Sequence, residues 1–199
     1  MATIHVLDET TINKIAAGEV VERPASVVKE LIENSIDAGA TSIEVEIGEG
    51  GSAYMRITDN GKGMTEEDAR LAVLRHATSK IQNVEDLFDI ASLGFRGEAL
   101  ASIASVSHFI LTTRTVDQEL GTRILIDGGT FTDCIPYGAA PGTTIEVKEL
   151  FFNTPARRKF LKTERTESSK IQDIVGKLAL SNPHIAFKLT IDDRVAIIT

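Results

Sequence analysis

Several features that would restrict function are missing from this sequence of 199 residues. A single cysteine, Cys134, excludes an internal disulfide, fits a reducing compartment and is most simply a small packing residue. No run of 18 uncharged apolar residues exists, so no membrane-spanning helix is expected. The N-terminus lacks the basic and apolar regions of a secretory signal. These absences favour a cytoplasmic protein without a membrane partner.

Two kinds of site are also missing. No G-x-x-x-x-G-K-[ST] segment is present, which excludes a P-loop nucleotide site. The four histidines are scattered without metal-ligand spacing, so no zinc site is expected.

The net charge of −8 lies within the first 70 residues and argues against general coating of nucleic acid. Arg157–Lys170 is locally basic, and this segment is either the solvated face of a helix or a patch for a polyanion.

The spacing of apolar residues predicts both helices and strands. A helix is expected between Pro24 and Ala38, with proline in its first turn and Gly39 just past its end. Thr65 is the expected N-cap of a second helix over 66–77. Further helices are expected over 98–106 and 167–180, and strands over 41–48, 52–59, 108–115, 121–127, 130–137, 142–150, 185–192 and 194–199. Because these elements do not alternate as a βαβ series would, we predict an α+β fold, a two-layer sandwich with helices on one face of a mixed, largely antiparallel sheet.

Three polar side chains form a stripe on the first predicted helix. Glu30, Asn34 and Asp37 are spaced at i, i+4 and i+7, which places them within about 60° of arc. Taken alone, this stripe is most typical of the wetted side of an amphipathic helix. A carboxylate and a carboxamide one turn apart also suit a water and a hard cation held side by side, since Mg²⁺ prefers oxygen ligands and keeps several waters.

Glycine-rich segments provide the other candidate sites. "DNGKGM" (59–64) contains a strong turn signal, yet its glycines also permit close approach of a flat ligand, with a buried Asp59 accepting from an exocyclic amine. "GFRGEAL" (94–100) precedes an apolar helix. It is either a flexible turn or a set of backbone N–H groups that close around an anion. "GTT" (142–144) opens a strand and is explained equally well by structure alone.

Five segments, taken together and in order, resemble a known ATPase superfamily. They are "ELIENSIDAGA" (30–40), "DNGKGM", "RHATSKI" (75–81), "GFRGEALASI" (94–103) and "PGTTIEVKELFFNTPARRKFL" (141–161). The set resembles the GHKL superfamily of DNA gyrase, heat-shock chaperones, histidine kinases and MutL. "GFRGEAL" with "FNTPARRKFL" narrows the resemblance to the MutL family of DNA mismatch-repair proteins, over almost the whole chain from Ile12. It implies the GHKL (Bergerat) fold and an ATPase that requires ATP and Mg²⁺.

The resemblance also implies roles for individual residues. Glu30 would be the catalytic general base, Asn34 would hold Mg²⁺, Asp59 would bind the adenine amino group, and Thr143 would assist through water. The full set of expected ATP-binding residues is Asn34, Asp37, Ala38, Asp59, Gly63, Thr78, Ser79, Lys80, Gly94, Arg96, Gly97, Glu98, Ala99, Leu100 and Thr143. Within this set, 78–80 would lie in a lid over the nucleotide, and 96–100 would offer backbone amides to the phosphates.

Partners and domain organisation follow from the same resemblance. The segment 12–20 would pack across a second subunit when ATP orders the lid, so a homodimer is expected in the full-length ATP-bound protein. MutS is the expected repair partner, and the basic segment would contact DNA phosphates without reading bases. Residues 1–199 are expected to be an excised ATP-binding domain, without the transducer and C-terminal dimerisation domains. Such a fragment would be mostly monomeric, weak in hydrolysis and, in the cell, bacterial, cytoplasmic and nucleoid-associated.

Two alternatives remain beside the ATPase switch. A histidine-kinase-type ATP-binding domain would share the asparagine and the glycine-rich turn, but "GFRGEAL" and a base suited to water at Glu30 argue against it. A non-catalytic module, in which ATP only gates association, would bind nucleotide without turnover. Substitution of Glu30 separates this module from the ATPase.

Overall fold

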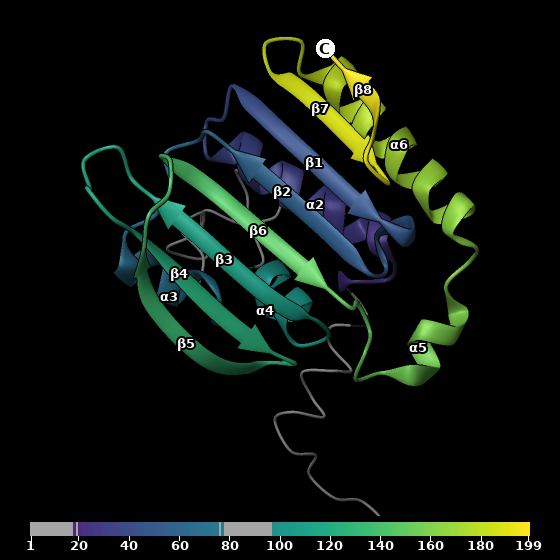
Figure 1. Ribbon diagram of the computed structural model, residues 1–199, viewed down its shortest axis with the longest axis horizontal. Helices are drawn as coiled ribbons and strands as arrows, with labels where there is room; N and C mark the ends of the chain where they lie inside the picture. The colour runs from purple at the N-terminus through teal and green to yellow at the C-terminus, as the bar shows by residue number, and fades with distance from the viewer. Residues whose placement is uncertain (1–17, 19, 76, 78–96) are drawn as a thin grey trace, which may run out of the picture.

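The computed structural model describes residues 18, 20–75, 77 and 97–199. Within this part of the chain, eight strands form one sheet in the order β5-β4-β3-β6-β2-β1-β7-β8 (Figure 1). The strands are β1 Ser42–Gly48, β2 Tyr54–Asp59, β3 His108–Arg114, β4 Gly121–Asp127, β5 Thr130–Tyr137, β6 Gly142–Lys148, β7 Ala186–Ile191 and β8 Arg194–Ile198. All neighbouring strands are antiparallel except β1 and β7, which are parallel. The predicted mixed, largely antiparallel sheet is confirmed.

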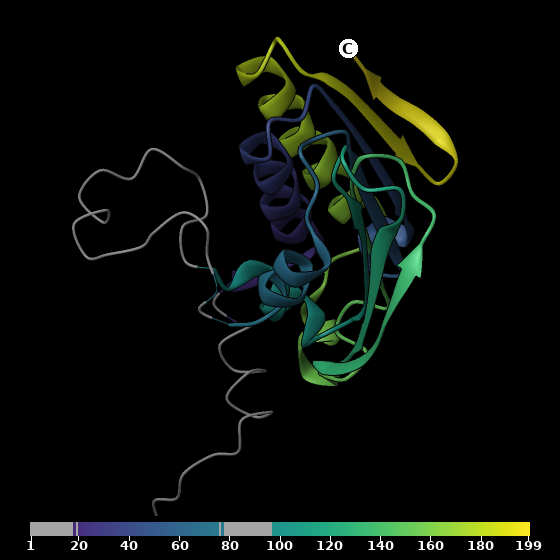
Figure 2. The ribbon, with the colours of Figure 1, turned by 90° about the vertical axis from the view of Figure 1, so that its left-hand side faces the viewer.

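Helices cover one face of this sheet, as the side view shows (Figure 2). They are α2 Pro24–Asp37, α3 Glu66–Ala72, α4 Ala99–Ala104 and α6 Glu164–Ser181, while α5 Pro155–Phe160 lies near one end of the sheet. Alternate strand residues point into the layer between sheet and helices, where a continuous apolar core forms. The strand residues of this core include Ile43, Val45, Ile47, Met55, Ile57, Phe109, Leu111, Ile124, Val147, Phe187 and Leu189. This arrangement is the predicted two-layer α+β sandwich.

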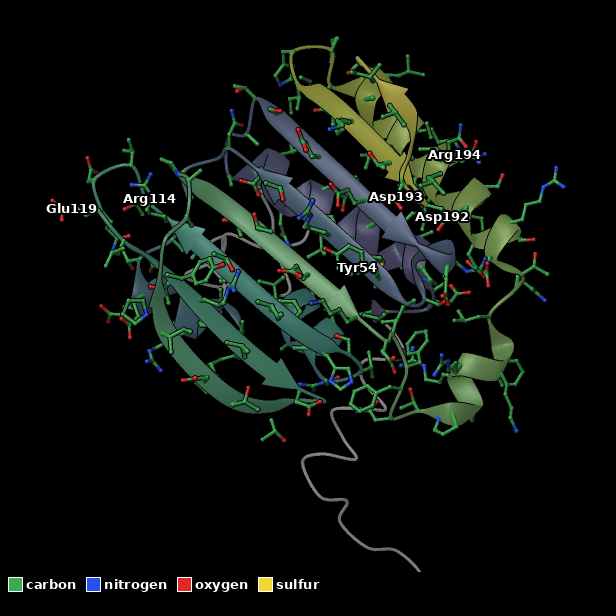
Figure 3. All side chains as sticks on the ribbon, viewed as in Figure 1. Tyr54, Arg114, Glu119, Asp192, Asp193 and Arg194 are labelled. Atoms are coloured by element: carbon green, nitrogen blue, oxygen red, sulfur yellow. The ribbon has the colours of Figure 1, made fainter. Side chains whose placement is uncertain are left out.

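The opposite face of the sheet is polar and open. It faces the viewer in Figure 3, where Tyr54 is labelled. Ion pairs occupy this face, among them Lys188 of β7 to Glu44 of β1 at 3.7 Å and, within β6, Lys148 to Glu146 at 3.1 Å. Because such exposed pairs contribute little to stability, the fold is held by the core on the other side. Among the described residues, no helix is long and apolar enough to cross a membrane.

The ends of α2 follow the local signals in its sequence. Pro24 occupies the first turn, where its missing N–H costs no helical hydrogen bond. After Asp37 the chain turns at Gly39, whose φ of +74° is readily adopted by glycine. The inward side carries Val27, Val28, Leu31 and Ile32, all buried. Helix α2 therefore lies with a fixed rotation over the sheet, and this rotation sets the direction of its polar side chains.

The structure departs from the sequence prediction at other helices. Thr65 does cap α3, since its Oγ1 accepts from the Asp68 N–H at 3.1 Å. The helix nevertheless ends at Ala72 rather than at 77, because the Leu74 N–H bonds to the Leu71 carbonyl in a tighter turn. Helix α5 and the 3₁₀ turn η1 (Glu49–Gly51) were not predicted. Helix α6 begins three residues earlier than expected, with Thr163 as its N-cap.

Candidate functional site

A buried carboxylate lies where α2 crosses the ends of β2 and β6. Asp59 is the last residue of β2 and is 9% exposed. Its Oδ2 accepts from the Ser35 hydroxyl at 2.8 Å, and its Oδ1 accepts from the Gly61 N–H at 2.8 Å. Burial raises the pKa of Asp59, although the Gly61, Ser35 and Thr143 hydrogen bonds favour its ionised form. The Asp59 carboxylate is therefore a buried hydrogen-bond acceptor whose orientation is fixed by Ser35 and Gly61.

A hydroxyl pair extends this site onto the neighbouring strands. Thr143 of β6 lies opposite Asp59 in the sheet and opposite Thr113 of β3 on its other side. Thr113 donates to the Gly142 carbonyl at 3.0 Å and accepts from the Met64 N–H at 2.9 Å. The single hydroxyl proton of Thr113 is used in its bond to the Gly142 carbonyl. In the 3.1 Å contact between the Thr113 and Thr143 hydroxyls, Thr143 is therefore the donor. Thr143 consequently keeps its oxygen lone pairs available as acceptors, beside those of Asp59.

Two glycines of this region, Gly63 and Gly142, are required by the backbone packing. Gly63 has a φ of +67°, and a Cβ there would lie 2.0 Å from the Arg114 carbonyl oxygen. Gly142 has a φ of +121°, and a Cβ there would lie 2.1 Å from the Asp59 carbonyl oxygen. Both glycines therefore permit two backbone segments to cross. Whether Gly63 also lies beside a ligand stays a prediction.

The predicted stripe on α2 runs from the middle of the helix to its C-terminal end. Glu30 and Asn34 are half-buried and Asp37 is exposed, while Ala38 is the half-buried C-cap. Glu30 borders a cavity of about 340 Å³ between the N-terminal half of α2 and the middle of α6. Asp59, in contrast, is bonded to the last turns of α2. One helix thus carries candidate groups for two different tasks, with the candidate general base near its middle and the buried acceptor site against its last turns.

The predicted anion site at α4 is only partly within the described residues. Gly97 has a φ of +62°, and Glu98 is the N-cap without a side-chain hydrogen bond to the helix. Helix α4 then begins at Ala99, and residues 97–100 are all half-buried. The predicted residues Thr78, Ser79, Lys80, Gly94 and Arg96 lie outside the described part of the chain. The anion-binding role of this segment stays a prediction.

The donor set near Asn34 fits a cation that is shared with a ligand. Within the described ranges, no group of three histidine, cysteine or acidic side chains is placed to hold a metal by itself. A half-buried asparagine on a rigid helix supplies one neutral oxygen. Mg²⁺ accepts such a partial protein contribution when waters and ligand oxygens complete its six positions. Asn34 is therefore suited to this task only when an oxygen-rich ligand is bound.

Two functional residues were missed by sequence reasoning, Ser35 and Thr113. Both are buried, at 3% and 0% exposed, and both fix the acceptors described above. The signal for Ser35 was a polar residue four positions after Leu31, on the apolar side of α2. The signal for Thr113 was its inward alternation with Phe109 and Leu111. A polar residue within a predicted apolar face is thus a useful pointer to a site.

Comparison with known proteins agrees with this geometry. Residues 22–127 match the family described as histidine kinase-, DNA gyrase B- and HSP90-like ATPase. The chain is 58% identical over its full length to the DNA mismatch repair protein MutL of Caldanaerobacter subterraneus, of which it covers 34%. It is 57% identical over 98% of its length to MutL of Desulforamulus reducens, of which it covers 30%. The chain thus spans about a third of the length of these curated relatives.

Solved structures give the same result. The ATPase domain of Aquifex aeolicus MutL, in complex with ADP, superposes with a TM-score of 0.72 at 37% identity, covering 90% of this chain and 64% of that one. The N-terminal domain of a DNA repair protein superposes with a TM-score of 0.78 at 29% identity, covering 94% and 56%. The family match spans more than half of the chain, and the fold agrees with it. The chain therefore belongs to the family of histidine kinase-, DNA gyrase B- and HSP90-like ATPases.

Proposed function

We propose that this chain is the ATP-binding domain of a MutL-type mismatch-repair protein, which binds and hydrolyses ATP with Mg²⁺. The observation that carries the proposal is the buried carboxylate of Asp59, fixed by Ser35 and Gly61 at the end of β2. Each carboxylate oxygen can accept a further hydrogen bond beside the one it has, so this fixed acceptor suits a ligand with a matching N–H group. The adenine amino group is such a donor. The solved Aquifex relative, a complex with ADP, supports this choice of ligand.

Glu30 is the proposed general base. Its half-buried carboxylate lies on α2 one turn before Asn34, so the two side chains lie on the same side of the helix. Glu30 would orient a water for attack and take its proton, while Asn34 would help to hold the ion. When bound, Mg²⁺ supplies charge neutralisation at the phosphate oxygens. Asp37 and the start of α4 would complete the enclosure of the phosphates.

The wider role is a nucleotide switch. In this proposal ATP binding promotes dimerisation through the N-terminal segment, and the dimer recruits MutS and other repair proteins in the bacterial cytoplasm. The isolated domain would remain mostly monomeric and hydrolyse ATP slowly, since other domains of a longer protein would support the closed state. Basic side chains of α5 would contact DNA phosphates. Arg157 would not be among them, because its guanidinium already donates to the Val21 carbonyl.

The proposal is tested by nucleotide titration with turnover measured on the same sample. ATP should bind more tightly than GTP, because the guanine ring presents a carbonyl oxygen where adenine presents its amino group. Binding should tighten when Mg²⁺ is added, and slow release of phosphate should follow. Equal affinity for ATP and GTP would contradict adenine recognition by Asp59. Binding with no phosphate release at all would favour the non-catalytic module instead.

Replacing Asn34 by alanine is expected to remove the Mg²⁺ dependence of ATP binding. The change deletes the one direct protein ligand of the ion in this proposal, so magnesium should no longer strengthen ATP affinity. Titration calorimetry with MgATP and with ATP in excess chelator measures this difference. Asn34→Asp is the matched control, since a carboxylate oxygen is a good Mg²⁺ ligand and should keep the dependence. If Mg²⁺ still strengthened ATP binding to the same extent in Asn34→Ala, Asn34 would be only a solvated residue of an amphipathic helix and not a ligand of the ion.

A further inference from the structure

The residues just before α2 are held by a helix much later in the chain. The Val21 carbonyl accepts a hydrogen bond from Nη2 of Arg157, which belongs to α5. The Arg157 guanidinium also lies over the Phe151 ring, 4.4 Å from its centre. Phe151 is fully buried, and its N–H donates to the Val106 carbonyl at 2.7 Å. The guanidinium of Arg157 is thus packed on the buried ring of Phe151. The Val21 carbonyl that accepts from it lies two positions before Arg23, the N-cap of α2.

The N-cap residue itself is close to α6. Arg23 Nη1 lies 4.0 Å from Oε2 of Glu167, a carboxylate that is 2% exposed. Oε1 of the same carboxylate accepts from the Lys162 N–H at 3.0 Å, in the loop that joins α5 to α6. The turn η1 fills the space between these helices, because a Cβ on Gly51 would lie 2.9 Å from Pro24 and one on Gly50 2.9 Å from Glu164. The start of α2 is therefore packed against the segment from α5 to α6.

The two ends of α2 have separate supports. At its C-terminal end, Ser35 is bonded to Asp59, and the Ala38 carbonyl accepts from the Lys62 N–H at 3.0 Å. In its N-terminal half, the side that includes Ser26 and Glu30 borders the 340 Å³ cavity. A helix rises 1.5 Å per residue, so Arg23 and Ser35 are roughly 18 Å apart along the axis. The position of Glu30 thus depends more on the N-terminal support than the position of Ser35 does.

We propose that Arg157 is a positioning residue for Glu30, which acts by fastening the start of α2 to α5 through the Val21 carbonyl. This inference rests on the proposed ATPase function. It assigns to Arg157, within a basic segment, a role that differs from that of its exposed neighbours Arg158 and Lys159. Loss of the contact should shift the first turns of α2 while leaving the Asp59 site in place. General-base catalysis is sensitive to displacements of an ångström or less, whereas ATP affinity depends on the undisturbed end.

The test compares Arg157→Ala with the control variant Lys188→Ala, which removes one positive charge from the open face of the sheet, outside the proposed ATP and DNA sites. Arg157→Ala is expected to lower turnover at saturating ATP about 10-fold, with ATP affinity within about 2-fold of the parent. Amide hydrogen exchange should become faster in the peptide covering 20–31 and stay unchanged around Asp59. Lys188→Ala should match the parent in all three measurements. Arg157→Lys, which can still donate to the Val21 carbonyl, should recover part of the turnover.

Several outcomes would overturn the inference. Equal turnover in Arg157→Ala and Lys188→Ala, in a parent that hydrolyses ATP, would contradict the positioning role and leave the proposed function intact. A parallel loss of ATP affinity, turnover and thermal stability in both Arg157→Ala and Arg157→Lys would make the residue a general structural support. A parent that binds ATP but never releases phosphate would contradict the proposed function itself, and the positioning role with it.

Discussion

Replacing Glu30 by alanine is expected to lower ATP turnover by about 10²- to 10⁴-fold, the usual contribution of a general base. The residue lies in the N-terminal half of α2, half-buried and one turn from Asn34. Removal of its carboxylate takes away the proton acceptor for the attacking water but none of the contacts at Asp59. ATP affinity should therefore remain within a few-fold of the parent. Phosphate release at saturating MgATP measures the loss, and equilibrium titration measures the affinity.

Glu30→Gln is the sharper form of the same experiment. The amide keeps the size and most of the hydrogen bonding of the glutamate but cannot accept a proton at neutral pH. It should be as inactive as Glu30→Ala. Glu44→Ala, which removes a carboxylate from the open face of the sheet, should keep the turnover of the parent. If Glu30→Gln turned over at the parental rate, Glu30 would not be the base, and any hydrolysis would need another group.

Replacing Asp59 by asparagine is expected to weaken ATP binding by about 1–3 kcal/mol, or roughly 5- to 150-fold. In the parent, both carboxylate oxygens accept, one of them from Ser35 and the other from Gly61. An asparagine can keep the Gly61 bond through its oxygen only by turning its NH₂ group toward Ser35 and the ligand. A donor would then face the adenine amino group. Titration with ATP measures the loss, and unaltered affinity would remove Asp59 from the binding site.

The same change should leave the fold as stable as the parent or more stable. Burial is the largest influence on Asp59 and raises its pKa in the folded state. The native state therefore binds this proton more tightly than the unfolded chain does. Its contribution to the free energy of unfolding is present at acidic pH and is lost as pH rises through the raised native pKa. Asparagine has no such loss, so the stability advantage of Asp59→Asn should grow from about pH 4 upward. Urea unfolding across this range measures it. A variant that is less stable at neutral pH would show that the donors outweigh burial.

The fold was largely predictable because its strands alternate cleanly and its main helix carries both end signals. Helix α2 was bounded by Pro24 and Gly39, and each of these residues acts as its chemistry requires. Helix α5 was missed because all of its six residues are exposed or only half-buried, which leaves no apolar periodicity to detect. The early end of α3 also has no strong local signal. Sheet order was beyond prediction, because residues that pair across the sheet are separated by long stretches of chain.

The fold brings together two of the residues that the sequence nominated for the site. Asp59 and Thr143 were expected and are neighbours across β2 and β6. What the sequence did not reveal is how they are held, since Ser35 and Thr113 act through contacts that depend on the packing of α2 and β3. The role of Arg157 was likewise hidden. A basic run looks uniform in sequence, and only the fold separates the arginine that faces the protein from those that face solvent.

The single parallel pairing in the sheet has a consequence for how the protein is made. Strands β1 and β2 leave the ribosome early as a hairpin, but β1 can complete its second edge only with β7, which begins at Ala186. At a synthesis rate of about 5–20 residues per second, β1 waits roughly 7–30 s with that edge unpaired. The β1–β2 hairpin therefore emerges early, and its second edge is completed only when β7 has been made. During this interval β1 is a free strand edge within a nascent chain, the kind of segment that holding chaperones protect and that mispairs when they are scarce.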